Sequence, residues 1–158
     1  MWGAISGLAN IVALAFAPGL FPSWYDLVVA IGYGLLLPVI AVLHVRQVLV
    51  RQSGAVLATA AGTATVAVGI AASGNPELVV AGLFVCGIWW WTIGKMWAET
   101  GVLPRALGVA TMTLGALTIA AAVATAPLAM DTGPIWIAER ALLGLWTLAL
   151  SLALWRMR

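Results

Sequence analysis

Charged residues are scarce in this chain. Lys, Arg, Asp and Glu make up 8% of its 158 residues, against roughly 25% in a soluble domain. Hydrophobic residues make up 64%, and a water-soluble fold of this size could not hide so much apolar surface. The seven basic residues border long hydrophobic stretches. The net charge of +2 therefore indicates membrane orientation rather than binding to nucleic acid.

Residues that carry chemistry are equally rare. The single cysteine, Cys86, excludes a disulfide framework within the chain and a cysteine metal cluster. The single lysine, Lys95, lies near a predicted membrane surface, whereas a Schiff-base pigment requires a lysine at mid-membrane. The sequence has no Walker loop, HExxH, CxxC or serine elbow, and no two acids share one deep helix face. We therefore expect a non-enzymatic protein, and the sequence identifies no cofactor and no metal site.

The long hydrophobic stretches predict the fold. A helix of about 20 apolar residues crosses the hydrocarbon core of a bilayer. Continuous apolar runs favour such helices over the alternating strands of a β-barrel. We predict an all-α polytopic membrane bundle of six transmembrane helices, in a single domain covering residues 1–158. The approximate helices are 2–17, 27–45, 55–73, 78–97, 104–126 and 135–155.

The basic residues predict that both termini are cytoplasmic. Short cytoplasmic loops carry an excess of Lys and Arg. With the N-terminus inside, only Arg140 would lie at the outer side. The basic residues of the inner side would then be Arg46, Arg51, Lys95, Arg105, Arg156 and Arg158.

Residues 2–17 have a second interpretation. Ala15-Phe16-Ala17 resembles the cleavage site of a secretory signal. However, the segment has no positively charged start, and the rigid Pro18 would follow the scissile bond. A retained helix is the favoured interpretation, and a cleaved signal is the alternative.

The triplet Trp89-Trp90-Trp91 is the most unusual local feature, and Trp97 lies two turns beyond Trp90. Successive helical residues point about 100° apart, so at least one indole of the triplet should face neighbouring helices. These four residues are candidate ligand-binding residues, forming an aromatic wall for a quinone, carotenoid or sterol-like lipid. The alternative is packing together with the interfacial aromatic belt, to which we assign Trp2, Trp24, Tyr25, Trp136 and Trp155.

Lys95, Glu99 and His44 are candidates for an ion path. Lys95 and Glu99 are four residues apart, share a helix face and can form an ion pair. His44 lies near the inner end of the second span. In the alternative interpretation, Lys95 extends to the headgroups, Glu99 is hydrated and His44 is an ordinary interfacial side chain. Ligation of a tetrapyrrole by His44 is a further alternative.

Glu139 and Arg140 lie at the outer end of the sixth span. If the helix begins near Ile135, they stand little more than one turn inside it and point in different directions. We expect pairing with Asp131 or Asp26 across the outer surface to satisfy them.

Small residues recur at helix-packing intervals. They let helix backbones approach closely in a solvent that supplies no hydrophobic drive for association. Pro38 should remove one backbone hydrogen bond and kink the second span near Gly34. The recurring residues are Gly3 and Gly7, Ala58 and Gly62, Gly87 and Gly94, and Gly108, Gly115 and Ala122.

The stretch from Trp91 to Gly115 combines a tryptophan-rich helix, the loop sequence TGVLPRALG at 100–108, and a glycine-containing helix. It resembles the corresponding loop of uncharacterised six-helix bacterial membrane proteins grouped as a domain of unknown function. The resemblance covers about a sixth of the chain, and its proline and arginine are ordinary residues for a helix start at the inner surface. It implies a multi-pass protein of a bacterial inner membrane, and no activity.

The minimal loops and the small and aromatic helix faces favour one functional class. We expect an accessory or scaffold subunit of a membrane complex, with lipid or pigment as its ligand. Its partners would be the bilayer and other membrane subunits or further copies of itself. The alternative is a small transporter or channel, in which Lys95, Glu99 and His44 line an inward-facing vestibule. An enzyme acting on a lipid or quinone is a third and weaker possibility, because no nucleophile or metal site can be named for it.

Overall fold

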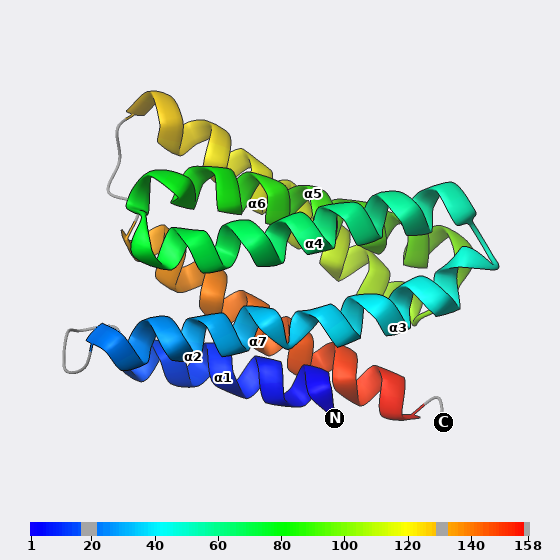
Figure 1. Cartoon of the computed structure of the whole chain (residues 1–158). Helices are drawn as coiled ribbons and strands as arrows, with labels where there is room; N and C mark the ends of the chain where they lie inside the picture. Colours follow the sequence, from blue (N-terminus) through cyan, green and yellow to red (C-terminus); the bar gives the residue numbers. More distant parts are fainter. Residues whose placement is uncertain (17–21, 129–132, 157–158) are drawn as a thin grey trace.

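The computed structural model of this protein describes residues 1–16, 22–128 and 133–156. Apart from one interruption at Leu35, each helix runs opposite to the helix before it, so that the N-terminus, the link between 48 and 52, the link between 100 and 105 and the end of the last helix lie at one end of the bundle (Figure 1). We call this the basic end. Within the described residues the elements are α1 (Trp2–Phe16), α2 (Pro22–Gly34), α3 (Leu36–Val48), α4 (Gln52–Gly74), η1 (Pro76–Leu78), α5 (Val79–Thr100), α6 (Arg105–Leu128) and α7 (Gly133–Arg156).

The predicted all-α architecture is confirmed. Of the described residues, five helical segments are long and apolar enough to cross a membrane. The first predicted span is shorter, because the apolar part of α1 covers Trp2–Leu14. The five segments are Trp24–Val48, Gln52–Ala72, Val79–Thr100, Arg105–Thr125 and Pro134–Arg156.

Pro38 explains why the second predicted span is divided into α2 and α3. Proline has no N–H to donate to the carbonyl four residues earlier, which here belongs to Gly34. The helix is interrupted at Leu35, although the Leu35 N–H still donates to the Ile31 carbonyl at 3.0 Å. The interruption lies beside Gly34, where the kink was predicted.

Glycines bring α5 and α6 into backbone contact, as their spacing predicts. A Cβ on Gly108 would lie 2.6 Å from the Ala98 nitrogen, closer than real side chains approach. Because lipid is as apolar as a side chain, such close packing is the main force that joins two helices in a membrane. The contact is lined by Gly87 and Gly94 of α5 and by Gly108 and Gly115 of α6.

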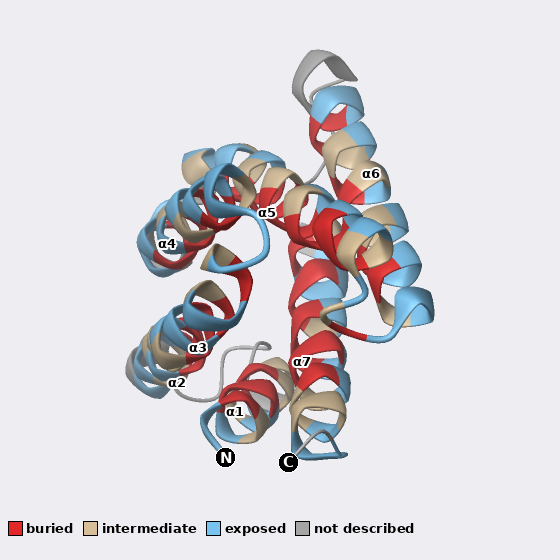
Figure 2. Ribbon diagram, turned by 90° about the vertical axis from the view of Figure 1, so that its right-hand side faces the viewer, coloured by how far each residue is buried: buried red, intermediate tan, exposed pale blue. Residues whose placement is uncertain are grey.

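A second close contact joins α1 to α7. A Cβ on Gly7 would lie 2.7 Å from the Gly144 carbonyl oxygen and 2.7 Å from Thr147 Oγ1. By contrast, α7 reaches α2 and α5 mainly through large side chains, which fill the interior of the bundle. The buried residues face this interior, and α6 lies outside it against α5 (Figure 2).

Replacing Gly94 by alanine tests the backbone contact. The new methyl group would meet the Met112 nitrogen, whereas a methyl group on Gly82 of the same helix would lie 3.6 Å from Val68. We expect Gly94→Ala to lower the free energy of unfolding by about 1–3 kcal/mol. The control Gly82→Ala should leave it unchanged or raise it by up to about 1 kcal/mol, because its methyl group fits and alanine favours the helix. Thermal unfolding in detergent measures both, and equal stability of the two variants would contradict the packing argument.

Candidate functional site

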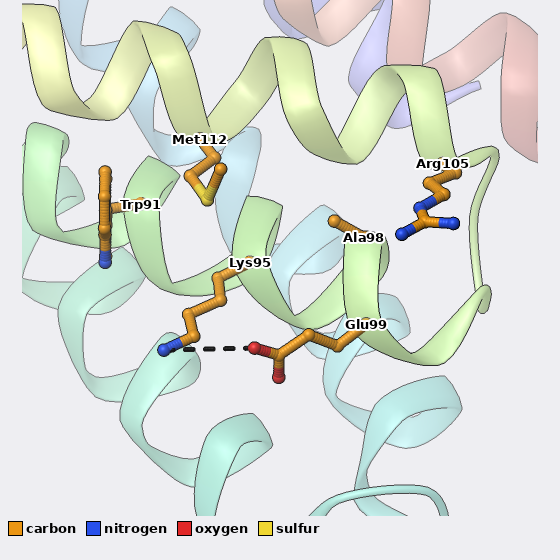
Figure 3. Close-up of a pocket in the computed structure, with 6 residues that line it drawn as sticks. All are labelled: Trp91, Lys95, Ala98, Glu99, Arg105 and Met112. Carbon is orange, nitrogen blue, oxygen red and sulfur yellow. Dashed lines mark ion pairs between the residues drawn. The ribbon is translucent and has the colours of Figure 1, made fainter.

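A groove lies on the outward face of α5 near the basic end. Trp91 and Lys95 form a ridge between two hollows, one of about 370 Å³ beside α6 and one of about 330 Å³ beside α4. Figure 3 shows the first hollow, with Arg105 at the start of α6 and Lys95 and Glu99 on α5. We call the two hollows together the basic groove. They are lined by Trp91, Lys95, Ala98, Glu99, Arg105 and Met112, and by Arg51, Ser53, Gly54, Leu57, Trp91, Thr92, Lys95 and Met96.

The basic groove holds three cations and one acid. Glu99 forms ion pairs with Arg51 and, at 3.9 Å, with Lys95. Within the described part of the chain, Arg105 has no ion pair. These side chains are about half exposed, with 49% for Arg51, 54% for Lys95 and 44% for Glu99. The groove therefore carries an excess of positive charge that an anion can reach.

The Lys95–Glu99 pair was predicted from its spacing and is present, whereas Arg51 and Arg105 were not named as members of the same site. The positive-inside pattern placed both arginines at the same membrane depth as Lys95. That pattern was a signal for the groove, but only the packing of α4 and α6 against α5 brings the three cations together.

Three of the four candidate tryptophans are enclosed by protein. Trp89, Trp90 and Trp97 are at most 1% exposed, and each indole contacts Trp146 of α7. The ring centroids lie 5.3, 5.8 and 6.2 Å from that of Trp146. A Cβ on Gly62 would lie 2.8 Å from Trp89 Nε1, so this glycine of α4 makes room for the indole.

Trp146 was missing from the candidate residues. Its Nε1 donates a hydrogen bond to Thr111 Oγ1 at 2.9 Å, which ties α7 to α6 through the interior. Trp91 differs from its neighbours, because it is 42% exposed and lines both hollows of the basic groove. Of the four candidates, Trp91 is thus the one placed to touch a ligand in the groove.

His44 is separated from Lys95 and Glu99. The Thr59 hydroxyl donates to the Ala55 carbonyl at 2.8 Å, so its one hydrogen is used. The Thr59 oxygen must therefore accept a hydrogen bond from His44 Nδ1, which lies 2.7 Å away. The crevice beside His44 is a different one, bounded by α3, α4 and α5 and too narrow to hold water. The structure does not bring the three ion-path candidates into one vestibule.

Glu139 and Arg140 correct an expectation. Pairing across an outer surface was predicted, but Glu139 is 4% exposed and Arg140 is 0% exposed. The Tyr33 hydroxyl donates to Glu139 Oε2 at 3.2 Å, and the Cys86 thiol also lies beside this carboxyl group. Asp26 is exposed, and Asp131 lies outside the described residues.

The expected aromatic belt also changes in one place. Trp2, Trp24 and Trp155 are at least 50% exposed, as belt residues should be. Trp136 is only 8% exposed, and its ring stacks on Tyr33 with centroids 6.3 Å apart. Its position near a helix end predicted the belt, but its side chain faces the interior. Trp136 is therefore part of the core.

Comparison with protein-family models, curated protein sequences and solved structures gave no match to this chain. Its function must therefore be inferred from the groove and the interior themselves.

Trp146 should contribute much more to stability than Trp155 on the same helix. Trp146 is 4% exposed and contacts three other indoles, whereas Trp155 is 71% exposed. We expect Trp146→Ala to lower the free energy of unfolding by about 3–5 kcal/mol and Trp155→Ala to change it by less than about 0.5 kcal/mol. Denaturant or thermal unfolding in detergent measures this difference. A Trp146→Ala protein as stable as wild type would show that the indole cluster does not hold α7.

Proposed function

We propose that this protein is a non-enzymatic accessory subunit of a membrane assembly that binds an anionic phospholipid in the basic groove. In this proposal α1 also crosses the bilayer, so that the chain makes six crossings and both termini are cytoplasmic. The observation that carries the proposal is the gathering of Arg51, Lys95 and Arg105 around the exposed indole of Trp91.

The groove matches the chemistry of a phospholipid along its depth. Lys95 lies five residues before the end of α5, about 8 Å along the helix axis. Cations at this level meet the phosphate of a lipid, and basic pockets between helices on the cytoplasmic side bind anionic headgroups. Trp91 lies one turn deeper, where an indole contacts the glycerol region and the upper part of an acyl chain.

The accessory role rests on what the helices leave uncovered. The links between the helices are short, so the described chain offers mainly helix faces for interaction. Among the described residues, α6 packs on α5 and only slightly on α7. Its outward face exposes Val109, Leu117 and Val123. Such a face suits lipid or another membrane subunit, because both present apolar surface.

A small transporter is the second candidate function. The observation that favours it is the burial of Glu139 and Arg140, because ionisable residues inside a membrane bundle often mark substrate or proton pathways. Its original support was a vestibule lined by Lys95, Glu99 and His44. His44 lines a different crevice from Lys95 and Glu99, so the three residues do not form that vestibule.

The proposed orientation predicts which positions react with a label added outside the cell. In a Cys86→Ser background, Arg51→Cys and Arg105→Cys should be protected from a membrane-impermeant thiol reagent in intact cells. Glu77→Cys, at the opposite end of the bundle, should be labelled. All three positions should react after the membrane is opened. Labelling of the first two positions in intact cells would reverse the proposed topology.

Neutralising the groove should weaken lipid binding selectively. Each basic residue near an anionic surface contributes about 1 kcal/mol, so Lys95→Gln with Arg105→Gln should lower affinity for phosphatidylglycerol about thirtyfold. The matched control is Arg46→Gln with Arg156→Gln, which removes the same charge at the same end outside the groove. Native mass spectrometry of protein titrated with phosphatidylglycerol or phosphatidylcholine measures the bound lipid.

The outcomes of this titration separate the two functions. Equal losses in the groove and control variants, or no preference for phosphatidylglycerol over phosphatidylcholine, would contradict a specific lipid site. Ion flux in proteoliposomes that disappears on neutralising Lys95 or Glu99 would favour the transporter instead.

A further inference from the structure

Arg140 is a buried cation with no hydrogen-bond acceptor in the described part of the chain. The side chain is 0% exposed, and Nε, Nη1 and Nη2 have no hydrogen-bond partner among residues 1–16, 22–128 and 133–156. The guanidinium carbon lies 4.6 Å from the centre of the Trp136 ring, 5.4 Å from that of Tyr33 and 5.5 Å from that of Tyr25. Three aromatic rings therefore surround a group that has five N–H donors to satisfy.

The rings do not replace the missing acceptors. A cation–π contact stabilises a desolvated guanidinium, but it uses the ring face and leaves the N–H donors unbonded. Every unsatisfied buried donor carries a desolvation penalty of at least comparable size. Glu139 is the nearest acid in sequence, yet its carboxyl group is turned to the Tyr33 hydroxyl and to Cys86. Among the described residues, the guanidinium therefore lacks a hydrogen-bond acceptor.

We propose that Arg140 binds the carboxylate of an amphipathic ligand, such as a fatty acid. The planar guanidinium presents paired donors that match the two oxygens of a carboxylate. A single negative charge balances the one cation. A phosphate dianion would bring one negative charge more than Arg140 can balance, and an unbalanced charge is costly in a medium of low dielectric constant.

The surroundings of Arg140 suit an apolar chain attached to that carboxylate. Tyr33 and Trp136 are buried aromatic walls, and Tyr25 is only half buried near the start of α2. The rings cover the guanidinium in this conformation. The ligand enters by turning the Tyr25 ring aside, because Tyr25 is the least enclosed of the three aromatic residues. The site lies toward the end of the bundle opposite the basic groove and does not depend on lipid binding there.

The experiment measures thermal unfolding of the purified full chain in an uncharged detergent. Dodecanoate should raise the midpoint by roughly 5–10 °C when present at a hundred times its dissociation constant. Dodecanol tests the apolar chain without the charge, and acetate tests the carboxylate without the chain. Both should give a much smaller rise. An equal rise with dodecanol would overturn the proposal, as would the absence of any rise with dodecanoate.

Variants assign the response to Arg140. Arg140→Met should abolish the rise with dodecanoate while the ligand-free protein stays folded, because the substitution also removes the desolvation cost of the unsatisfied guanidinium donors. Arg140→Lys keeps the charge but lacks the paired N–H donors of the guanidinium, and it should weaken binding at least tenfold. The control Arg46→Met, an exposed position outside the basic groove, should respond like wild type.

Two results would contradict the assignment. The first is a full dodecanoate response in Arg140→Met or in Arg140→Lys. The second is that chloride or inorganic phosphate stabilises the wild type while dodecanoate does not, and that Arg140→Met loses this stabilisation. Arg140 would then be a site for an inorganic anion.

Discussion

The approach of α5 to α6 at the distance of backbone contact is the constraint on which the rest of the structure depends. In lipid, helices gain no hydrophobic energy by associating, so their contact must come from van der Waals packing. Glycine provides that packing by removing the side chain from the contact, as at Gly94 and Gly108. The same contact brings the start of α6 beside the last turns of α5, and so sets Arg105 next to Lys95 and Glu99. The charge of the basic groove thus depends on two glycines, one next to Lys95 and the other three residues after Arg105.

Where helices are not joined by glycine, large side chains fill the space between them. The interior between α7 and its neighbours holds Trp89, Trp90, Trp97 and Trp146 toward one end, and Tyr33, Trp136 and Arg140 toward the other. Several polar atoms of this interior have no hydrogen-bond partner among the described residues, including the Nε1 atoms of Trp90 and Trp97. Unsatisfied buried groups lower the stability of the arrangement that holds them. A ligand or a rearrangement that supplied partners for these atoms would therefore stabilise the interior.

The sequence predicts where each helix begins and ends far better than it predicts which side chains meet. The few charges limit where each helix can end, and Pro38 and the repeated glycines act locally, so helix positions, the kink and the α5–α6 contact all followed from single residues. The burial of Glu139, Arg140 and Trp136 did not follow. In a soluble helix the apolar stripe identifies the inner face, but in lipid both faces are apolar and the stripe disappears. Which side of a helix faces the interior then depends on partners distant in sequence, as the Tyr33 hydroxyl is for Glu139.

Arg105 and Arg140 show how position decides what the same side chain does. At the basic end, Arg105 is exposed and water satisfies its donors, so its charge adds little to stability and remains free to attract an anion. Salt weakens that attraction, because the screening length is only about 8 Å at physiological ionic strength. Inside the bundle, Arg140 is removed from water and ions, so an interaction made there is screened little and depends on geometry. The two proposed anion sites therefore differ in kind, one electrostatic and permissive at the surface, and one directional and selective in the interior.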